Sequence, residues 1–213
     1  MAKDRASAEI IKPLAVGDDV RRWRIQAGNR WVVFARRGIQ IDDYPAVKTH
    51  LMLWKTQLMP RKAGENIQGR KPGRYKWYEI QDEVAYFEAF ERPKIIFPDI
   101  CKEARFTFDR EKYYIDATAS CIGVDDIYLL GILNSAPTWR YMCEKFAVLG
   151  DAQKGGRMRL KSFYVEQIPI PDASSAERAA ITALVQKCLD AKGIGCEKWE
   201  AEINERVAAL YGL

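Results

Sequence analysis

Residues 92–100 read RPKIIFPDI, and their apolar centre at residues 94–97 predicts a β-strand. Isoleucine and phenylalanine favour strands because their side chains pack well on a pleated, half-buried surface. Further strands are predicted at residues 77–80, 106–108 and 113–124. A short helix is expected at residues 83–90. The sequence therefore predicts a mixed α/β fold, with a twisted sheet and flanking helices.

The N-terminal part of the chain predicts a hairpin followed by an amphipathic helix. Residues 23–34 combine two β-favouring arms with a turn at Gly28-Asn29. Asp43 is expected to cap the helix, and Pro45 suits its first turn because proline needs no N–H partner there. The face expected to be buried follows three- and four-residue steps through Tyr44, Val47, Leu51, Trp54 and Leu58.

The C-terminal third predicts several helices. Asp125 or Asp126 is expected to cap a long helix that Pro137 interrupts. Residues 174–192 and 197–211 predict two further helices, because apolar residues recur on one face of each.

Positive charge is concentrated in two glycine-bearing segments. Residues 60–78, PRKAGENIQGRKPGRYKWY, carry six bases and one acid, and the resulting +5 equals the net charge of the whole protein. Residues 150–163, GDAQKGGRMRLKSF, carry four bases and one acid. From residue 172 onward, seven acids outnumber five bases. The charge pattern therefore predicts phosphate binding within residues 1–172 and a helical packing or docking element at residues 173–213.

Composition narrows the class of protein. A chain of 213 residues with 48% hydrophobic residues can bury a core, which argues against disorder. The five cysteines form no CxxC pair and no signal peptide precedes them, so we expect reduced thiols and a cytoplasmic location. Apolar runs stay well below the roughly 20 residues that cross a bilayer, so no membrane partner is expected. The opening of the chain resembles a fragment boundary.

Catalytic and cofactor motifs are missing from the sequence. It contains neither GxGxxG nor GxxxxGK, and no asparagine precedes a proline as the tetrapeptide of amine methyltransferases requires. His50 is the only histidine, which weakens any histidine-based catalytic or metal site. Pro98-Asp99 could open a nuclease site, but the first downstream acid-x-Lys begins at Asp190, about ninety residues away. We predict no catalytic residue, metal site or cofactor in this chain.

The two basic segments carry the remaining functional signal. Lysine and arginine neutralise phosphates, whereas arginine, asparagine and glutamine can read base edges in the major groove. Trp77 and Tyr78 could stack on bases, but we expect them in the core. The residues predicted to contact DNA are Arg61, Lys62, Asn66, Gln68, Arg70, Lys71, Arg74, Lys76, Lys154, Arg157, Arg159 and Lys161.

Six blocks in order resemble the TaqI-like C-terminal specificity domain of adenine-specific DNA methyltransferases and fused type IIG restriction–modification enzymes. These blocks are IIKPL…GDDVRRW at residues 10–23, YPAV…HL from residue 44, GRYKWYEI at 73–80, RPKIIFPDI at 92–100, LLGILNS at 129–135 and YVEQIPIP at 164–171. The closing EINERVAALYGL resembles the helix that ends many of these proteins, and the likeness covers residues 8–212.

The resemblance implies that residues 1–172 form a target recognition domain that binds double-stranded DNA and performs no chemistry. A separate catalytic domain of the same parent polypeptide would flip an adenine and methylate it with S-adenosylmethionine. In the fused enzymes a nuclease domain would be a further partner. Two other functions stay open: a stand-alone metal-dependent DNA nuclease that uses Asp99, and an interaction module whose basic loops bind an acidic protein.

Overall fold

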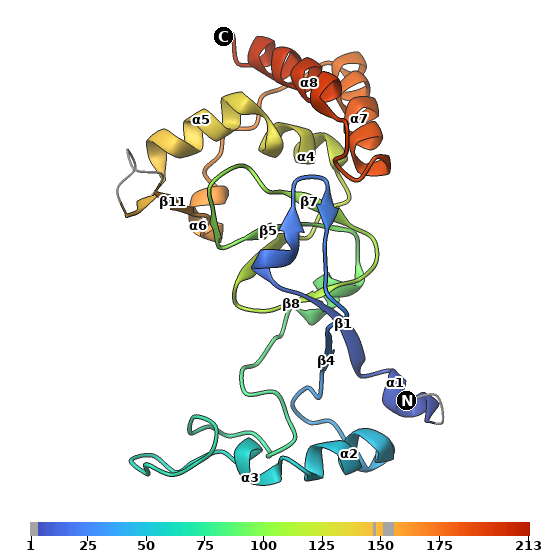
Figure 1. Cartoon of the computed structure of the whole chain (residues 1–213), viewed down its shortest axis with the longest axis vertical. Helices are drawn as coiled ribbons and strands as arrows, with labels where there is room; N and C mark the ends of the chain where they lie inside the picture. Colours follow the sequence, from blue (N-terminus) through green and yellow to red (C-terminus); the bar gives the residue numbers. More distant parts are fainter. Residues whose placement is uncertain (1–3, 147, 151–155) are drawn as a thin grey trace. The chain divides into compact units, whose positions relative to one another are not determined.

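The computed structural model describes residues 4–146, 148–150 and 156–213, and it divides into two compact units (Figure 1). The first unit comprises the described residues up to Pro13 together with Asn29–Glu88. The second comprises Leu14–Gly28 and Ala89–Leu213. The predicted mixed α/β class is confirmed, although the strands form several small sheets and not one twisted sheet.

The first unit is built on one short strand pair and three helices. Residues 11–13 of β1 (Ile11–Ala15) pair antiparallel with β4 (Trp31–Val33). The helices are α1 (Arg5–Ala8), α2 (Pro45–Met52) and α3 (Lys55–Leu58), and the 3-10 turn η2 (Ile41–Asp43) precedes α2. Ile10, Ile41 and Val47 form the small core of this unit.

Three predictions for the N-terminal part are wrong. The arms of the predicted hairpin do not pair with each other, because β4 pairs with β1 and β3 (Arg24–Ile25) pairs with β2 (Val20–Arg21). The helix predicted from Asp43 breaks after α2, so Trp54 is 52% exposed and not buried. Asp43 does not cap it: Tyr44 is the N-cap, and Asp4 Oδ2 accepts the Ala46 N–H at 3.1 Å.

The second unit has a three-stranded antiparallel sheet at its centre. In this sheet β5 (Lys94–Pro98) lies between β7 (Thr107–Asp109) and β9 (Ala119–Ile122), and all five residues of β5 are buried. A second small sheet has the order β10 (Val148–Leu149), β11 (Arg157–Arg159) and β6 (Ile100–Cys101). The last two residues of β1 pair in parallel with β8 (Tyr114–Ile115). The short helices of the described residues also include the 3-10 helix η1 (Gly17–Asp19), the 3-10 helix η3 (Phe87–Glu91), which begins in the first unit, and the α-helix α6 (Ser162–Val165).

The strand predicted at residues 94–97 is confirmed, whereas the one predicted at residues 77–80 is wrong. That segment forms turns and pairs with no strand. The helix expected at residues 83–90 shrinks to the 3-10 turn η3.

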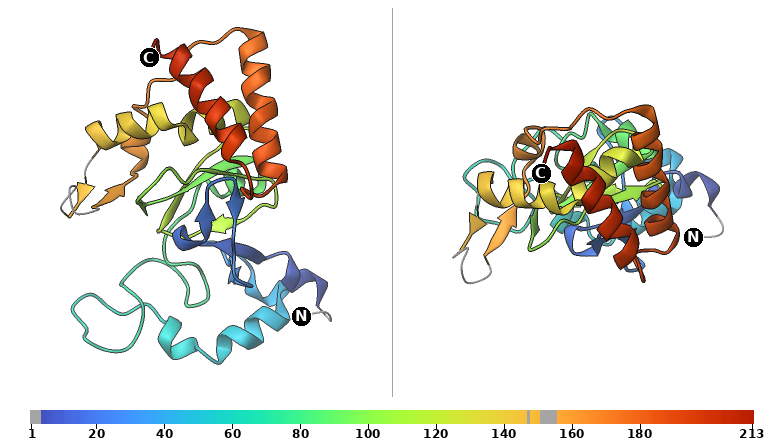
Figure 2. Two further views of the ribbon diagram at one scale, coloured as in Figure 1. Left: turned by 45° about the horizontal axis from the view of Figure 1, so that its top comes forward. Right: turned by 90° about the horizontal axis from the view of Figure 1, so that it is seen from above.

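The predicted C-terminal helices are confirmed. Asp126 caps α4 (Ile127–Asn134), and the predicted interruption falls at Ser135, so Pro137 lies in the first turn of α5 (Ala136–Lys145). The long helices α7 (Ser175–Asp190) and α8 (Glu197–Leu210) run beside each other, and α7 packs on α4 (Figure 2). Their side chains share one hydrophobic core with β5, while the functional division at residue 172 stays a prediction. Within the described residues, none of the helices is both long and apolar enough to cross a membrane.

Candidate nucleic-acid interface

The first basic loop, residues 60–78, closes on itself at a narrow neck. Pro60 and Arg70 form a β-bridge, the Arg61 N–H donates to the Arg70 carbonyl at 3.0 Å, and the Arg70 N–H donates to the Met59 carbonyl at 2.9 Å. Gly69 lies at the neck with φ +146, and a Cβ there would stand 2.6 Å from the Met59 oxygen. Only glycine fits this position without a shift of the backbone.

Arg70 lies inside this loop and organises it. Its Nε donates to the Leu58 carbonyl at 2.7 Å, Nη1 to Glu79 at 2.8 Å, and Nη2 to Trp77 at 2.8 Å and Lys76 at 3.4 Å. The guanidinium stacks 4.6 Å from the Tyr75 ring centre, and burial lowers its pKa. Four of its five N–H groups therefore bind the main chain, and this conformation leaves few of them for DNA.

Two further contacts hold the C-terminal end of the loop. The buried carboxylate of Glu79 accepts the Lys76 N–H at 2.7 Å and the Gly38 N–H at 2.9 Å. The Tyr75 hydroxyl donates to the Lys71 carbonyl at close range. Sequence reasoning gave Glu79 no role, because Gly38 lies 41 residues away along the chain.

The other predicted residues of this loop face solvent to different degrees. Lys62, Asn66, Gln68 and Arg74 are exposed, and their side chains make no hydrogen bond or ion pair with the part of the chain that the structure describes. Of the three remaining cations, Lys71 pairs with Asp82, and Lys76 lies 5.6 Å from the centre of the Tyr78 ring, with Tyr78 raising its pKa. Arg61 is half-buried, and its Nε has no hydrogen-bond partner among the described residues.

Apolar and aromatic groups accompany the basic residues of the first unit. Tyr78 packs against the small core, and the Trp77 ring contacts the Tyr78 ring edge-on, with 5.4 Å between the ring centroids. Both side chains are half-buried, so the expectation that they lie in the core is met only in part. The exposed apolar residues nearby in sequence are Met52, Leu53, Trp54, Met59 and Ile67. The sequence pattern had assigned Trp54 to a buried helix face and had given the other four no role.

The second basic segment forms an alternating strand in the second unit. Arg157 and Arg159 of β11 are exposed on either side of the buried Met158. The Asp99 carboxylate, 15% exposed, binds Lys161 Nζ at 2.8 Å and Arg159 Nε at 3.5 Å. Asp99 thus holds two of the predicted cations beside each other. Lys154 lies outside the described residues.

A hollow of about 640 Å³ adjoins these cations and brings in two that the sequence did not single out. Lys102 and Arg105 line it together with Arg157 and Asp99. Lys102 comes next to Cys101, whose strand partner is Met158, so the pairing of β6 with β11 brings these bases together. Sequence reasoning could not find them, because about fifty residues separate them from the second basic segment.

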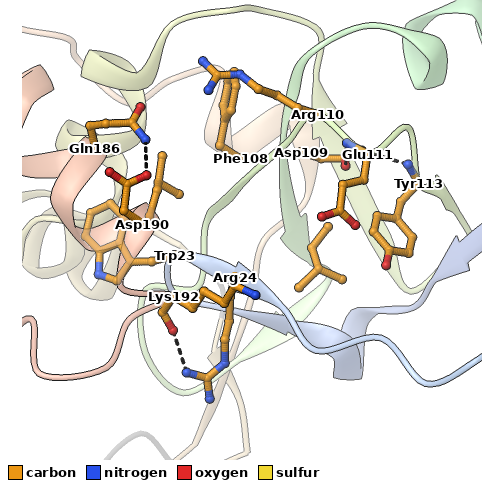
Figure 3. Close-up of a pocket in the computed structure, with 12 residues that line it drawn as sticks. Trp23, Arg24, Phe108, Asp109, Arg110, Glu111, Tyr113, Gln186, Asp190 and Lys192 are labelled. Atoms are coloured by element: carbon orange, nitrogen blue, oxygen red, sulfur yellow. Dashed lines mark hydrogen bonds between the residues drawn. The ribbon is translucent and has the colours of Figure 1, made fainter.

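A smaller hollow, of about 250 Å³, lies between the β2–β3 hairpin, the end of β7 and α7 (Figure 3). Several of its polar side chains are already hydrogen-bonded: Arg24 Nη1 donates to the Lys192 main-chain carbonyl at 2.7 Å, and Gln186 Nε2 donates to Asp190 Oδ1 at 2.7 Å. Trp23 at its base is buried. These paired groups fit a packing role.

Groups for metal or nucleophilic chemistry are sparse. Within the described ranges, no cluster of three or more His, Cys, Asp or Glu residues could hold a metal ion. The five cysteines are unpaired, and burial raises the pKa of Cys101 and Cys188 to about 12, which keeps these thiols protonated at neutral pH.

Comparison with known proteins gives this geometry a context. The chain is 24% identical over 208 residues to the type II methyltransferase M.PaeR7I of Pseudomonas aeruginosa, which covers 94% of this chain and 33% of the relative. It is equally similar to the type II methyltransferase M.BanIII of Aneurinibacillus aneurinilyticus, over 87% of this chain and 33% of the relative. The chain thus spans about a third of the length of these relatives. Residues 12–170 match the model of one family, and the chain belongs to the TaqI-like C-terminal specificity domains.

Proposed function

We propose that this chain is the double-stranded DNA target recognition domain of an adenine-specific methyltransferase in a type II restriction–modification system. One observation carries the proposal: the two basic segments, residues 60–78 and 150–163, expose cations on a chain that belongs to a specificity-domain family. Such cations neutralise DNA phosphates and release the counterions bound to them, and the neighbouring asparagine and glutamine side chains can read base edges.

In this proposal the chain binds and positions DNA, and the chemistry belongs elsewhere. A catalytic domain of the same parent polypeptide binds S-adenosylmethionine and methylates a flipped adenine. The parent polypeptide carries this domain with or without a nuclease domain. Residues 173–213 support the recognition domain or dock that catalytic domain. A cytoplasmic location, where the DNA lies, is part of the proposal.

The salt dependence of DNA binding tests it. If about six phosphates are contacted, the logarithm of the association constant should fall against the logarithm of salt concentration with a slope near −5. Replacement of both Arg157 and Arg159 by alanine should reduce that slope by about 2. The double variant Lys48→Ala/Arg5→Ala, which removes two cations outside the basic segments, should leave the slope nearly unchanged. No retention of DNA by the unmodified chain at low salt would refute the proposal.

The nuclease alternative finds less support in the geometry. Asp99 is bound by two cations, and within the described residues it belongs to no cluster of three or more His, Cys, Asp or Glu residues that could hold a metal ion. Incubation of the chain with plasmid DNA and magnesium or manganese should leave the plasmid uncut. Cleavage that Asp99→Ala abolishes would favour the nuclease.

A further inference from the structure

The segment between the two sides of the neck, residues 63–68, forms a tip with a distinct chemical character. It reads AGENIQ and contains no lysine or arginine, although the rest of the first basic loop carries six. Its one acid, Glu65, accepts the Lys62 N–H through Oε2 at 3.0 Å and thereby closes a local turn. The tip therefore cannot derive its affinity from positive charge.

The side chains of this tip point into solvent from a fixed base. Ile67 is 61% exposed, and Asn66 and Gln68 on either side of it are exposed without partners among the described residues. The neck hydrogen bonds and the Arg70 contacts hold the two chain ends from which the tip projects. Three adjacent exposed groups, amide, branched alkyl and amide, are thus presented by a preorganised loop.

Each of these groups matches one feature of an A·T pair in the major groove. A carboxamide of asparagine or glutamine bonds bidentately to N6 and N7 of adenine, and an alkyl group contacts the thymine methyl. Guanine is read by arginine or lysine, and the tip has neither. Arg70, the nearest arginine after the tip, is occupied by main-chain oxygens.

We propose that Asn66, Ile67 and Gln68 read A·T base pairs in the major groove, and that Arg70 positions them without touching DNA. This inference rests on the proposed function and adds the class of base that the first basic loop recognises. Lys62 and Arg74, exposed on either side of the tip in the sequence, contact the flanking phosphates.

The experiment begins with selection of duplexes that bind the full 213-residue chain from a random library. In the selected duplex, 7-deazaadenine then replaces single adenines to remove N7, and uracil replaces single thymines to remove the methyl group. We expect each critical substitution to weaken binding at least about 5-fold. The adenine effect should disappear in Asn66→Ala or Gln68→Ala, and the thymine effect in Ile67→Ala.

Gln57→Ala serves as the matched control, because Gln57 is an exposed glutamine of α3 in the same unit. It should retain both base effects. Arg70→Lys keeps the charge, so it should retain the salt slope of wild type and lose the A·T preference. A circular dichroism spectrum equal to that of wild type would show that this variant is folded; if it is not, the Asn66, Ile67 and Gln68 variants decide alone.

The possible failures are distinct. A chain that binds DNA but selects no A·T pair, or whose base effects persist in the three tip variants, overturns the inference and leaves the proposed function in place. A chain that binds no DNA at low salt refutes the proposed function, and the inference falls with it.

Discussion

The guanidinium of Arg70 is surrounded by main-chain oxygens from both ends of the first basic loop. Its removal would leave four main-chain carbonyls without their donor and an empty space beside the Tyr75 ring. We therefore expect Arg70→Ala to lower the free energy of unfolding by about 1–3 kcal/mol, measured by urea unfolding. Arg74→Ala, at an exposed position four residues away, should change it by less than about 0.5 kcal/mol. Equal effects of the two variants would contradict the assigned role.

Lys94 and Asp109 form an ion pair that is fully buried in the central sheet of the second unit. Lys94 also donates to the Phe90 carbonyl at 2.8 Å, and Asp109 accepts the Tyr113 N–H at 2.9 Å. Because Lys94→Met leaves the Asp109 charge buried without its cation, it should cost about 3–5 kcal/mol in thermal or urea unfolding. Lys48→Met, which breaks the exposed pair with Asp42, should cost at most about 1 kcal/mol. A small loss for Lys94→Met would contradict the burial of the pair.

The buried thiols predict how stability responds to alkali. Cys101 and Cys188 ionise near pH 9 when unfolded, whereas burial raises their pKa to about 12 in the fold. Between these values the unfolded chain has lost protons that the folded chain retains, so the free energy of unfolding should fall as the pH rises. Below pH 9 both thiols keep their protons in the folded and the unfolded chain, so the stability that depends on their protonation is fully present. The urea midpoint should drop from pH 9 to 11, and less steeply in Cys101→Ala/Cys188→Ala; equal slopes would contradict it.

At the scale of elements, close approach of α4 and α7 depends on one missing side chain. A Cβ on Gly131 would lie 2.8 Å from Val185 Cγ2 and 3.0 Å from Ile181 Cγ2. We expect Gly131→Ala to destabilise the fold by about 1–3 kcal/mol in calorimetry, because overpacking forces the two helices apart. Gly123→Ala, with no atom closer than 4.0 Å, is the matched control and should be nearly neutral. A neutral Gly131→Ala would show that the interface relaxes freely.

Local patterns predicted the elements well where neighbours in sequence decide them. The buried strand β5, the Asp126 cap and the break before Pro137 all follow from short-range signals. The hairpin at residues 23–34 failed because β4 pairs with the distant β1. The candidate site shows the same limit: charge counting found Arg157 and Arg159, but Lys102 and Arg105 join them only through strand pairing. A charge count also could not show that Arg70 binds carbonyls.

At the scale of the whole molecule, the C-terminal helices belong to the core of the second unit. Ile181, Val185 and Val207 pack in the same cluster as Ile95 and Phe97. A chain shortened to residues 1–172 should therefore lose cooperative unfolding and near-ultraviolet circular dichroism. The Leu213 deletion, which removes one exposed residue from the same end, is the control. Native-like unfolding of the shortened chain would show that residues 173–213 are a separable element.

The contacts of Arg70 also bear on how such a protein changes over generations. Its partners are the main-chain oxygens of Leu58, Lys76, Trp77 and Glu79, and every amino acid supplies such an oxygen. The contacts of Arg70 therefore do not depend on the side chains of residues 63–68. Six-residue inserts of other composition between Lys62 and Gly69 could replace residues 63–68 while the anchoring survives. If residues 63–68 read bases as proposed, exchange of these six residues would change the target preference while the Arg70 contacts persist.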